Sequence, residues 1–174
     1  MGGCLTMKSQ LETHRLILRE VRESDAIPLY HMIYHNPNVL KTFLARYMEN
    51  ENQANVTNLL DFQQSGKLIY IIEIKQSHEV IGMLLEQDDH SNTIELGYAI
   101  GEPFWNQGYT TEAMKEVIFH LFQDGYTKVT AQCFRENLAS MRVMQKCGMI
   151  QTKTCYLLSW MGSNHEVIEF EVLK

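Results

Sequence analysis

Alternating hydrophobic and polar residues indicate strands in the first part of the chain. Leu16 and Leu18 fall on one face of residues 15–21, which predicts a strand there. Further strands are predicted at 67–74, 79–86 and 93–100. Polar turns at 75–78 and 87–92 separate these three strands, so we expect them to follow one another in the sheet.

Helices are predicted where capping and stop residues bound a segment of helical character. Ser24 and Asp25 offer an N-cap for a helix that runs to about His35, where Asn36-Pro37 ends it. A second helix is predicted at 51–65, with Gly66 as its stop. The chain then continues with helices at 108–124 and 137–148 and strands at 128–134, about 150–159 and 165–173.

This order of elements predicts an α+β or mixed α/β fold, in which helices pack on a sheet. The chain has 174 residues, 45% of them hydrophobic, which is enough for one packed core. We therefore expect a single domain over residues 1–174, with residues 1–11 as a flexible N-terminal extension.

Charge and composition narrow the function. The net charge of −6 argues against nucleic acid as a partner and is compatible with a cationic acceptor. The sequence has no apolar run that could span a bilayer and no signal peptide, so we expect a cytoplasmic protein without a membrane partner. The four cysteines lack metal-ligand spacing, so no metal is expected. Residues 1–6 match an N-myristoylation signal, but so short a match often arises by chance.

The loop at 105–108 carries the strongest chemical signal, because it leads from the strand at 93–100 directly into a helix. A glycine-containing loop of this kind exposes unpaired backbone N–H groups at the positive end of a helix dipole, which suits a pyrophosphate. Taken alone the signal is weak, since many such turns bind nothing.

Two motifs, in this order and separation, make the signal specific. They read Phe104-Trp105-x-x-Gly108-Tyr109-x-Thr111-Glu112-Ala113 and Asn137-x-x-Ser140-x-Arg142-Val143-Met144-x-Lys146-x-Gly148. With them the chain resembles, over residues 12 to 173, the GNAT superfamily of acyl-coenzyme A dependent N-acyltransferases, and within it the ribosomal-protein N-terminal (alanine/serine) acetyltransferases. Trp105 and Gly108 fit that branch, whereas Thr110 replaces a small residue where backbone approaches phosphate.

The resemblance implies a mostly antiparallel sheet of about seven strands flanked by about four helices, with acetyl-coenzyme A as the cofactor. A backbone N–H near the end of the strand at 93–100 would polarise the thioester carbonyl. Asn137 would hold the pantetheine arm or simply cap its helix, and Ser140 would assist the departing thiolate. The cofactor-binding residues implied are Tyr98, Ala99, Ile100, Trp105, Asn106, Gln107, Gly108, Tyr109, Thr110, Thr111, Asn137 and Ser140.

Other side chains have simpler explanations beside their chemical ones. Glu95 shares a strand face with Thr93 and Gly97, so it is the candidate general base, although a cross-strand salt bridge is an equal explanation. Glu112 is interpreted as a structural residue in the first helical turn. The tyrosine that many family members carry near Met144 is absent.

The sequence therefore predicts an N-acetyltransferase in which a primary amine attacks acetyl-coenzyme A directly in a ternary complex. A covalent route through Cys133 or Cys147 is the weaker hypothesis. Protein N-termini, polyamines, amino acids and aminoglycoside-like drugs all remain open as acceptors, as does a homodimer. A non-catalytic acyl-coenzyme A sensing module is the alternative function.

Overall fold

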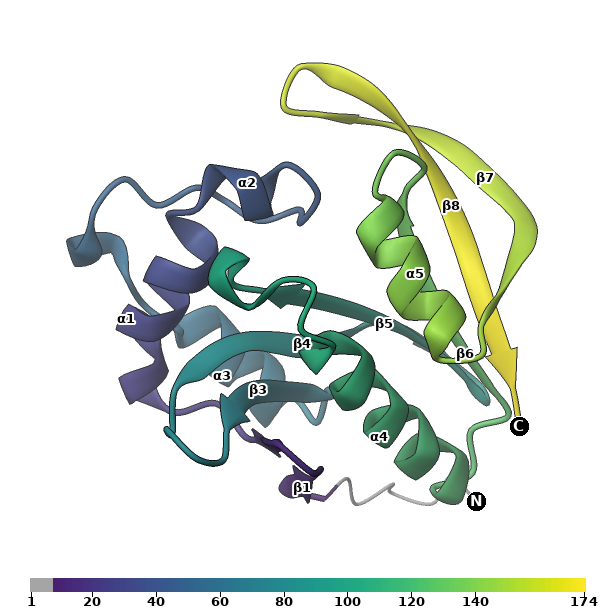
Figure 1. Cartoon of the computed structure of the whole chain (residues 1–174), viewed down its shortest axis with the longest axis horizontal. Helices are drawn as coiled ribbons and strands as arrows, with labels where there is room; N and C mark the ends of the chain where they lie inside the picture. The colour runs from purple at the N-terminus through teal and green to yellow at the C-terminus, as the bar shows by residue number, and fades with distance from the viewer. Residues whose placement is uncertain (1–7) are drawn as a thin grey trace.

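A single eight-stranded sheet runs through the computed structural model, which describes residues 8–174 (Figure 1). The strands lie in the order β1-β2-β3-β4-β5-β6-β8-β7, and all neighbours are antiparallel except β5 and β6. Their bounds are β1 Gln10–Glu12, β2 Leu16–Arg19, β3 Ile69–Ile74, β4 Val80–His90, β5 Thr93–Ile100, β6 Lys128–Phe134, β7 Ile150–Trp160 and β8 Ser163–Leu173. The predicted mixed, mostly antiparallel fold is confirmed, with one strand more than expected.

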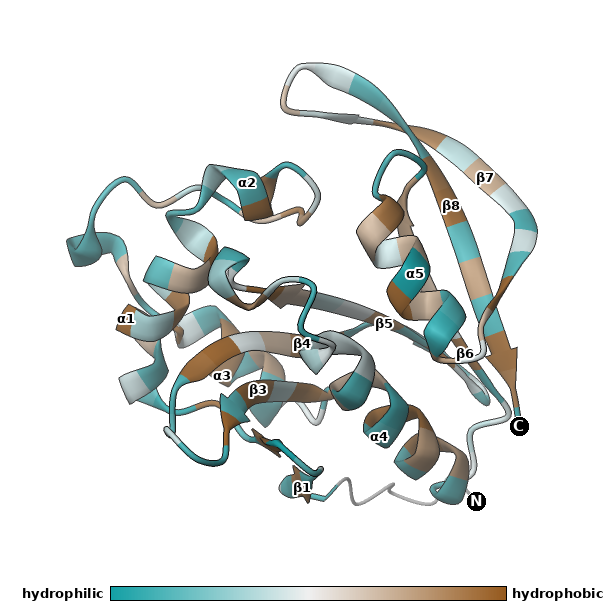
Figure 2. Cartoon of the chain, in the orientation of Figure 1, coloured by the Kyte–Doolittle hydropathy of each residue, from teal (hydrophilic) through white to brown (hydrophobic). Residues whose placement is uncertain are grey.

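Helices pack on both faces of the sheet. α4 (Tyr109–Gln123) and α5 (Leu138–Lys146) cover one face, whereas α1 (Ala26–Leu29), α2 (Pro37–Leu40) and α3 (Thr57–Gln64) lie on the other (Figure 1). Because both faces of β3 are covered, Ile69 and Ile71 are buried on the α1 side and Tyr70 and Ile72 on the α4 side. Figure 2 shows the resulting hydrophobic colouring along β3 and β4.

The sheet is open on one side of its C-terminal half. Most buried hydrophobic residues of β6 and β8 pack toward α4 and α5. Phe134 and Val167 are buried outside that cluster, and no residue of β6 or β8 belongs to the cluster on the α1 side. Glu95, Gln132 and Glu169 lie on that second face and are only partly buried. An uncovered polar face therefore adjoins the buried core.

β5 and β6 separate soon after they begin. The two strands pair only at Thr93 with Lys128, Ile94 with Val129 and Glu95 with Thr130. Beyond Glu95, β5 has no ladder partner on its β6 side, although β4 continues to pair with its other edge as far as Ile100. The parting leaves a cleft between two parallel strands in the middle of the sheet.

Several segment boundaries differ from the predicted ones. Residues 10 and 11, assigned to the extension, belong to β1, where Leu11 is buried, while the N-myristoylation match lies outside the described residues. β4 continues through the predicted turn to His90, because residues 88–90 pair with β5. This polar end of β4 faces solvent, and only residues 91–92 form the turn. The helix expected at 51–65 consists of a short 3-10 turn, Glu51–Gln53, and α3.

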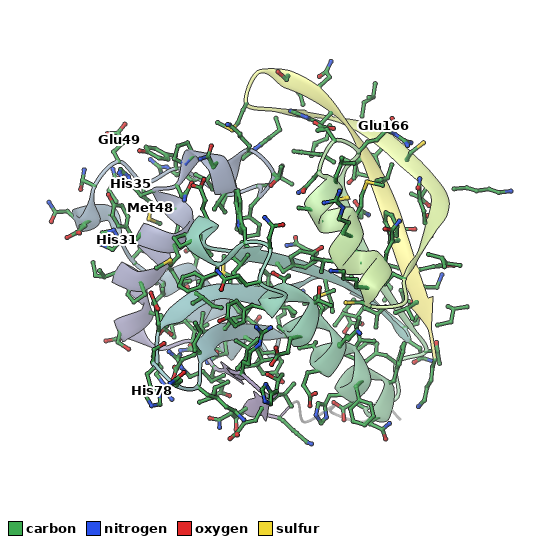
Figure 3. All side chains as sticks on the ribbon, viewed as in Figure 1. His31, His35, Met48, Glu49, His78 and Glu166 are labelled. Carbon is green, nitrogen blue, oxygen red and sulfur yellow. The ribbon has the colours of Figure 1, made fainter. Side chains whose placement is uncertain are left out.

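The first helical segment is also less regular than predicted. α1 continues as a π-helical turn, Tyr30–Tyr34, and Asn36 does not simply end the helix but caps α2 through its side chain. His35 stacks between Tyr30 and Tyr47, with ring centroids 4.9 and 5.3 Å away, and its Nδ1 lies 2.8 Å from the Met48 carbonyl (Figure 3). These contacts hold the loop that follows α2 against the π-helical turn that continues α1.

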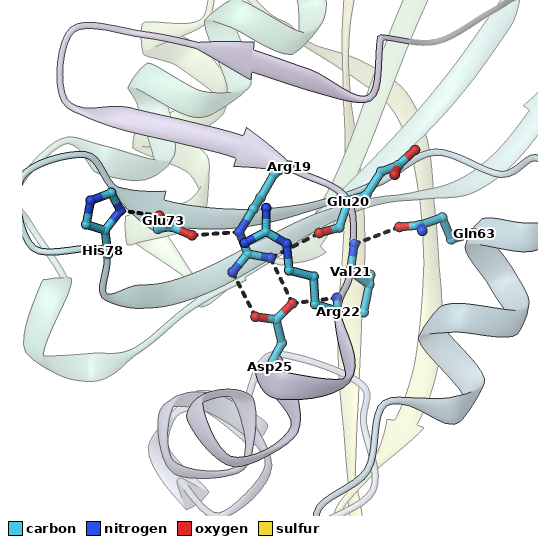
Figure 4. Close-up of polar contacts among 8 residues, drawn as sticks. All are labelled: Arg19, Glu20, Val21, Arg22, Asp25, Gln63, Glu73 and His78. Atoms are coloured by element: carbon cyan, nitrogen blue, oxygen red, sulfur yellow. Dashed lines mark hydrogen bonds and ion pairs between the residues drawn. The ribbon is translucent and has the colours of Figure 1, made fainter.

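Asp25 lies at the predicted N-cap position of α1, but its side chain makes no capping hydrogen bond there. Its carboxylate instead accepts the N–H of Arg22, the N-cap residue of the preceding 3-10 turn Glu23–Asp25, at 2.8 Å (Figure 4). Asp25 also receives two hydrogen bonds from the buried Arg19 guanidinium, at 2.8 and 2.9 Å, and Arg19 Nε donates to Glu73 at 2.6 Å. His78 is the second partner of Glu73. The network ties the start of α1 to β2 and β3.

Candidate active site

The parting of β5 and β6 opens into a cavity of about 820 Å³, here called the β5–β6 cleft. Its lining comes from β5, β6, the loop before α4, the first turn of α4, one face of α5, the segment around α2, and single residues of β4, β7 and β8. Eleven of the twelve predicted cofactor residues line it, as does Glu95; Gln107 does not. Its lining includes no histidine among the described residues, and His31 and His35 lie away from it (Figure 3).

The loop before α4 presents free backbone donors to the cleft. Gly108 occupies the N-cap position with φ of +83°, and no side chain within residues 8–174 caps the helix, so the first N–H groups of α4 lack a side-chain partner there. Asn106 also has a positive φ, +59°. Thr110 is only 9% exposed, so its side chain is mostly covered by protein at the place where a small residue was expected.

An arginine from the other end of the chain fixes this loop. Arg15 Nη1 donates to the Gln107 carbonyl at 3.1 Å, its Nε donates to Glu112 at 2.7 Å, and its guanidinium lies 4.2 Å from the Tyr109 ring centroid. Glu112 also accepts from the Thr13 hydroxyl at 2.6 Å and from the Arg15 N–H at 2.8 Å. Glu112 therefore has the predicted structural role, but it anchors the loop to the β1–β2 turn.

Trp105 and Gln107 also support the loop from within. The Trp105 indole N–H donates to the Ile100 carbonyl at 2.9 Å, and the Gln107 amide donates to the Pro103 carbonyl at 2.8 Å. The side chain of Gln107 is therefore used within the loop rather than toward the cleft. Phe104 meets the Tyr109 ring edge-on, as expected for a packing residue.

The start of α5 brings Ser140 against a tyrosine of β5. Asn137 caps α5, since its side-chain oxygen accepts the Ser140 N–H at 3.1 Å. Ser140 Oγ lies 2.7 Å from the hydroxyl of Tyr98, and both residues line the cleft. Burial raises the pKa of the Tyr98 phenol well above its usual value, although the hydrogen bond with Ser140 opposes this shift.

Glu95 lies on the opposite, open face of the sheet. Gln132 Nε2 donates to Glu95 Oε2 at 3.0 Å, and the Tyr156 hydroxyl donates to Gln132 Oε1 at 2.6 Å. Burial raises the pKa of Glu95, and the negative charges of Glu169 and Asp88 raise it further. Instead of the cross-strand salt bridge, Glu95 has an amide partner and acidic neighbours, an environment that brings a carboxyl group toward proton-accepting function near neutral pH.

Cysteine chemistry is disfavoured at this site. Burial raises the pKa of the Cys133 thiol to about 11, although the neighbouring Ser140 hydroxyl opposes the shift. Burial also raises the pKa of Cys147 to about 11. A thiol rather than a thiolate therefore predominates at neutral pH, and the thiolate is the nucleophilic form.

Sequence reasoning missed several contributors to the cleft, among them four polar groups. Arg142 and Lys146 line it from α5, and their spacing of four residues on one helix face was the available signal. Gln132 and the hydroxyl of Tyr98 act through contacts between distant segments, which alternation along a strand does not reveal. Within residues 8–174, no helix has the length and hydrophobicity needed to cross a membrane, and no group of three or more metal-ligating side chains occurs.

The sequence of this chain is similar to a known protein family and to known proteins. A family model described as Acetyltransferase (GNAT) domain matches residues 15–150. The Bacillus subtilis protein named uncharacterized N-acetyltransferase YoaA is 29% identical over 147 residues, covering 79% of this chain and 81% of YoaA.

Solved structures share the fold. The microcin C7 self-immunity acetyltransferase MccE, in complex with acetyl-CoA and AMP, has a TM-score of 0.82 at 20% identity and covers 97% of this chain and 98% of its own. RimL, a ribosomal L7/L12 alpha-N-protein acetyltransferase in complex with coenzyme A, has a TM-score of 0.82 at 18% identity. The superposition covers 94% of this chain and 97% of RimL.

Proposed function

Because the chain belongs to the acetyltransferase (GNAT) domain family, we propose that it transfers an acetyl group from acetyl-coenzyme A to a primary amine in the β5–β6 cleft. One observation carries the proposal: the cleft joins three features that this reaction needs. They are the uncapped N-terminus of α4, the Tyr98–Ser140 pair that joins β5 to the first turn of α5, and Glu95 on the open face.

The residues that line the cleft fit the cofactor. The N–H groups at the start of α4 suit a pyrophosphate, and Arg142 and Lys146 of α5 add two cations to the lining of the cleft. These local charges matter because the chain as a whole is negative and repels anions. Asn137 caps α5 and lines the cleft, which supports a contact with the pantetheine arm. The thioester of acetyl-coenzyme A supplies the activated acyl group.

The chain's own groups then have separate tasks. Glu95 receives the proton of the amine, through a water molecule. The backbone N–H groups of β5 beyond Glu95 are free on the β6 side and serve as an oxyanion site, a contribution of about 3 kcal/mol. The Ser140 hydroxyl hydrogen-bonds the leaving sulfur. Holding both reactants in one cleft contributes up to roughly 7–11 kcal/mol, so a covalent step through cysteine is unnecessary.

An α-amino group suits this site better than a lysine side chain. Deprotonation at pH 7 costs about 1.4 kcal/mol for an α-amino group with a pKa near 8, but about 4.6 kcal/mol for a lysine with a pKa near 10.4. A single carboxylate acting through water is adequate for the smaller cost. The negative charges of Glu95, Glu169 and Asp88 attract an acceptor that arrives as an ammonium ion.

A pair of peptides tests the proposal. One has a free N-terminus and no lysine, and the other has a blocked N-terminus and one lysine; release of free coenzyme A is measured with each. We expect faster release with the free N-terminus. Faster release with the lysine peptide would refute the α-amino preference alone, and a panel of polyamines, amino acids and aminoglycosides then identifies the acceptor.

Thermal unfolding separates catalysis from binding alone. Acetyl-coenzyme A at about 100 times its Kd adds roughly 2.7 kcal/mol of stability, and desulfo-coenzyme A stabilises as well. Stabilisation without release of coenzyme A from any acceptor would support the non-catalytic sensing module. No stabilisation by millimolar acetyl-coenzyme A would refute the proposed function itself.

A further inference from the structure

We infer that Tyr98 is a positioning residue that makes Ser140 a hydrogen-bond donor to the leaving sulfur. The inference rests on the proposed function and concerns the same cleft. It begins from the 2.7 Å separation between the Tyr98 hydroxyl and Ser140 Oγ, which joins the middle of β5 to the first turn of α5.

The shared hydrogen bond has a preferred direction. A phenol is a stronger acid than an aliphatic alcohol, so the Tyr98 O–H donates and Ser140 Oγ accepts. The other acceptor within reach of Tyr98, the Ser140 carbonyl, is farther away at 3.3 Å. Burial disfavours the tyrosinate, so Tyr98 keeps its proton and remains a donor across the pH range of the reaction.

Donation by Tyr98 determines what Ser140 can do. A serine hydroxyl has one proton, and if its oxygen accepts from Tyr98 that proton is free to point elsewhere. Two side chains lie beside Ser140 Oγ: Tyr98, whose hydroxyl is 2.7 Å away, and Cys133. The neighbouring Cys133 sulfur is a weak acceptor and competes poorly for the proton. Both Ser140 and Tyr98 line the cleft, so the free proton is available to an acceptor bound there.

In the proposed reaction, the amine nitrogen forms a bond to the acetyl carbon. The carbon–sulfur bond breaks with its electron pair going to sulfur, and the amine proton passes to Glu95 through water. The Ser140 O–H stabilises the thiolate that forms. The Tyr98 hydroxyl acts on the leaving group only through Ser140 and keeps its proton throughout. Tyr98 of β5 thus supports stabilisation of the leaving thiolate, a task for which α5 itself has no tyrosine.

The test measures the thiol pKa of bound coenzyme A by the ultraviolet absorbance of its thiolate, with the desulfo-coenzyme A complex as the baseline. In the wild-type protein this pKa should lie about one pH unit or more below that of free coenzyme A. Tyr98→Phe should raise it again by about one pH unit and lower kcat about 10-fold to 100-fold, while the Kd of desulfo-coenzyme A stays within about twofold.

Two further variants separate positioning from a general structural effect. Tyr70→Phe removes a buried hydroxyl remote from the cleft, where Tyr70 donates to the Lys8 carbonyl, and should change neither quantity. Ser140→Ala should raise the bound thiol pKa at least as much as Tyr98→Phe. The double variant should match Ser140→Ala, because Tyr98 acts only through Ser140.

Three outcomes would overturn the inference. The first is a bound thiol pKa in the wild type equal to that of free coenzyme A, a result that needs no variant to fold. The second is an unchanged pKa in Tyr98→Phe. The third is additive losses of kcat in the double variant. Each presupposes measured binding of coenzyme A, so it leaves the proposed function standing; absence of binding would refute both.

Discussion

Replacing Arg15 by methionine should weaken cofactor binding without impairing the chemical step. Arg15 reaches the loop before α4 through an ion pair with Glu112, a hydrogen bond to the Gln107 carbonyl and a cation–π contact with Tyr109. Its side chain is 38% exposed, so solvent screens the ion pair to about 1 kcal/mol or less. The other two contacts contribute about 1 kcal/mol each.

The total of roughly 2–3 kcal/mol is an upper limit, because Arg15 acts only by preorganising the loop. It corresponds to at most about 30-fold to 150-fold in Kd, and we expect about 10-fold. The fold should survive, since Glu112 keeps its hydrogen bonds from the Thr13 hydroxyl and the residue 15 backbone N–H.

Titration calorimetry with desulfo-coenzyme A measures the Kd, and initial rates at saturating acetyl-coenzyme A measure kcat. Arg22→Met is the matched control, because Arg22 is an exposed arginine that lines no part of the cleft. A Kd for Arg15→Met within twofold of the wild type, or a loss confined to kcat, would show that the loop holds its shape without this anchor.

Three other variants test the remaining parts of the site and fold. Asn137→Ala should raise KM for acetyl-coenzyme A with little change in kcat and cost about 1 kcal/mol of stability as a lost N-cap; a fall in kcat alone would contradict this. Glu95→Gln should flatten the rise of rate between about pH 6 and 8. It should also raise Tm at pH 7: burial raises the pKa of Glu95 in the folded state, so stability falls as pH rises from 4.5 through that pKa, and glutamine removes the cost. An unchanged pH profile would remove Glu95 from the mechanism. For Glu73, burial acts to raise the pKa, but hydrogen bonds from Arg19 and His78 lower it overall, so its stabilisation is complete above pH 4.5 and is lost as pH falls through the folded-state pKa. Glu73→Gln should cost about 2 kcal/mol in urea unfolding at pH 7, less than the roughly 3–5 of a broken lone pair because Asp25 remains, and the difference from wild type should shrink in acid.

The sequence predicted the elements whose stability arises locally. Gly108 and the helix after it, the Asn137 cap and the hydrophobic run of β3 are each encoded within a few residues. β1 was missed because three residues with one buried leucine have no measurable period. The end of β4 was mistaken for a turn because its residues face solvent and their polarity imitates a loop.

The site could be predicted only where a motif carried it. The loop and the first turn of α5 were found through their residue order. The N-cap position of Asp25 could be predicted, but the partner of its carboxylate, Arg19, could not, because Arg19 lies in another element. Tyr98 could be assigned to a strand, but nothing in the sequence brings its hydroxyl to Ser140, which lies 42 residues later. Contacts across such separations depend on the whole sheet.

The three-residue ladder between β5 and β6 has a consequence for how the molecule opens. Strands β1 to β5 and strands β6 to β8 share one hydrophobic core but few backbone hydrogen bonds, so we expect the sheet to open most readily between β5 and β6. In the unliganded protein, amide hydrogen exchange should be faster across β6, β7 and β8 than across β3 and β4. A molecule that fills the cleft contacts both parts of the sheet and should slow exchange in the second, including at amides far from any ligand atom. A ligand bound in the cleft would therefore also stabilise the junction between the two parts of the sheet.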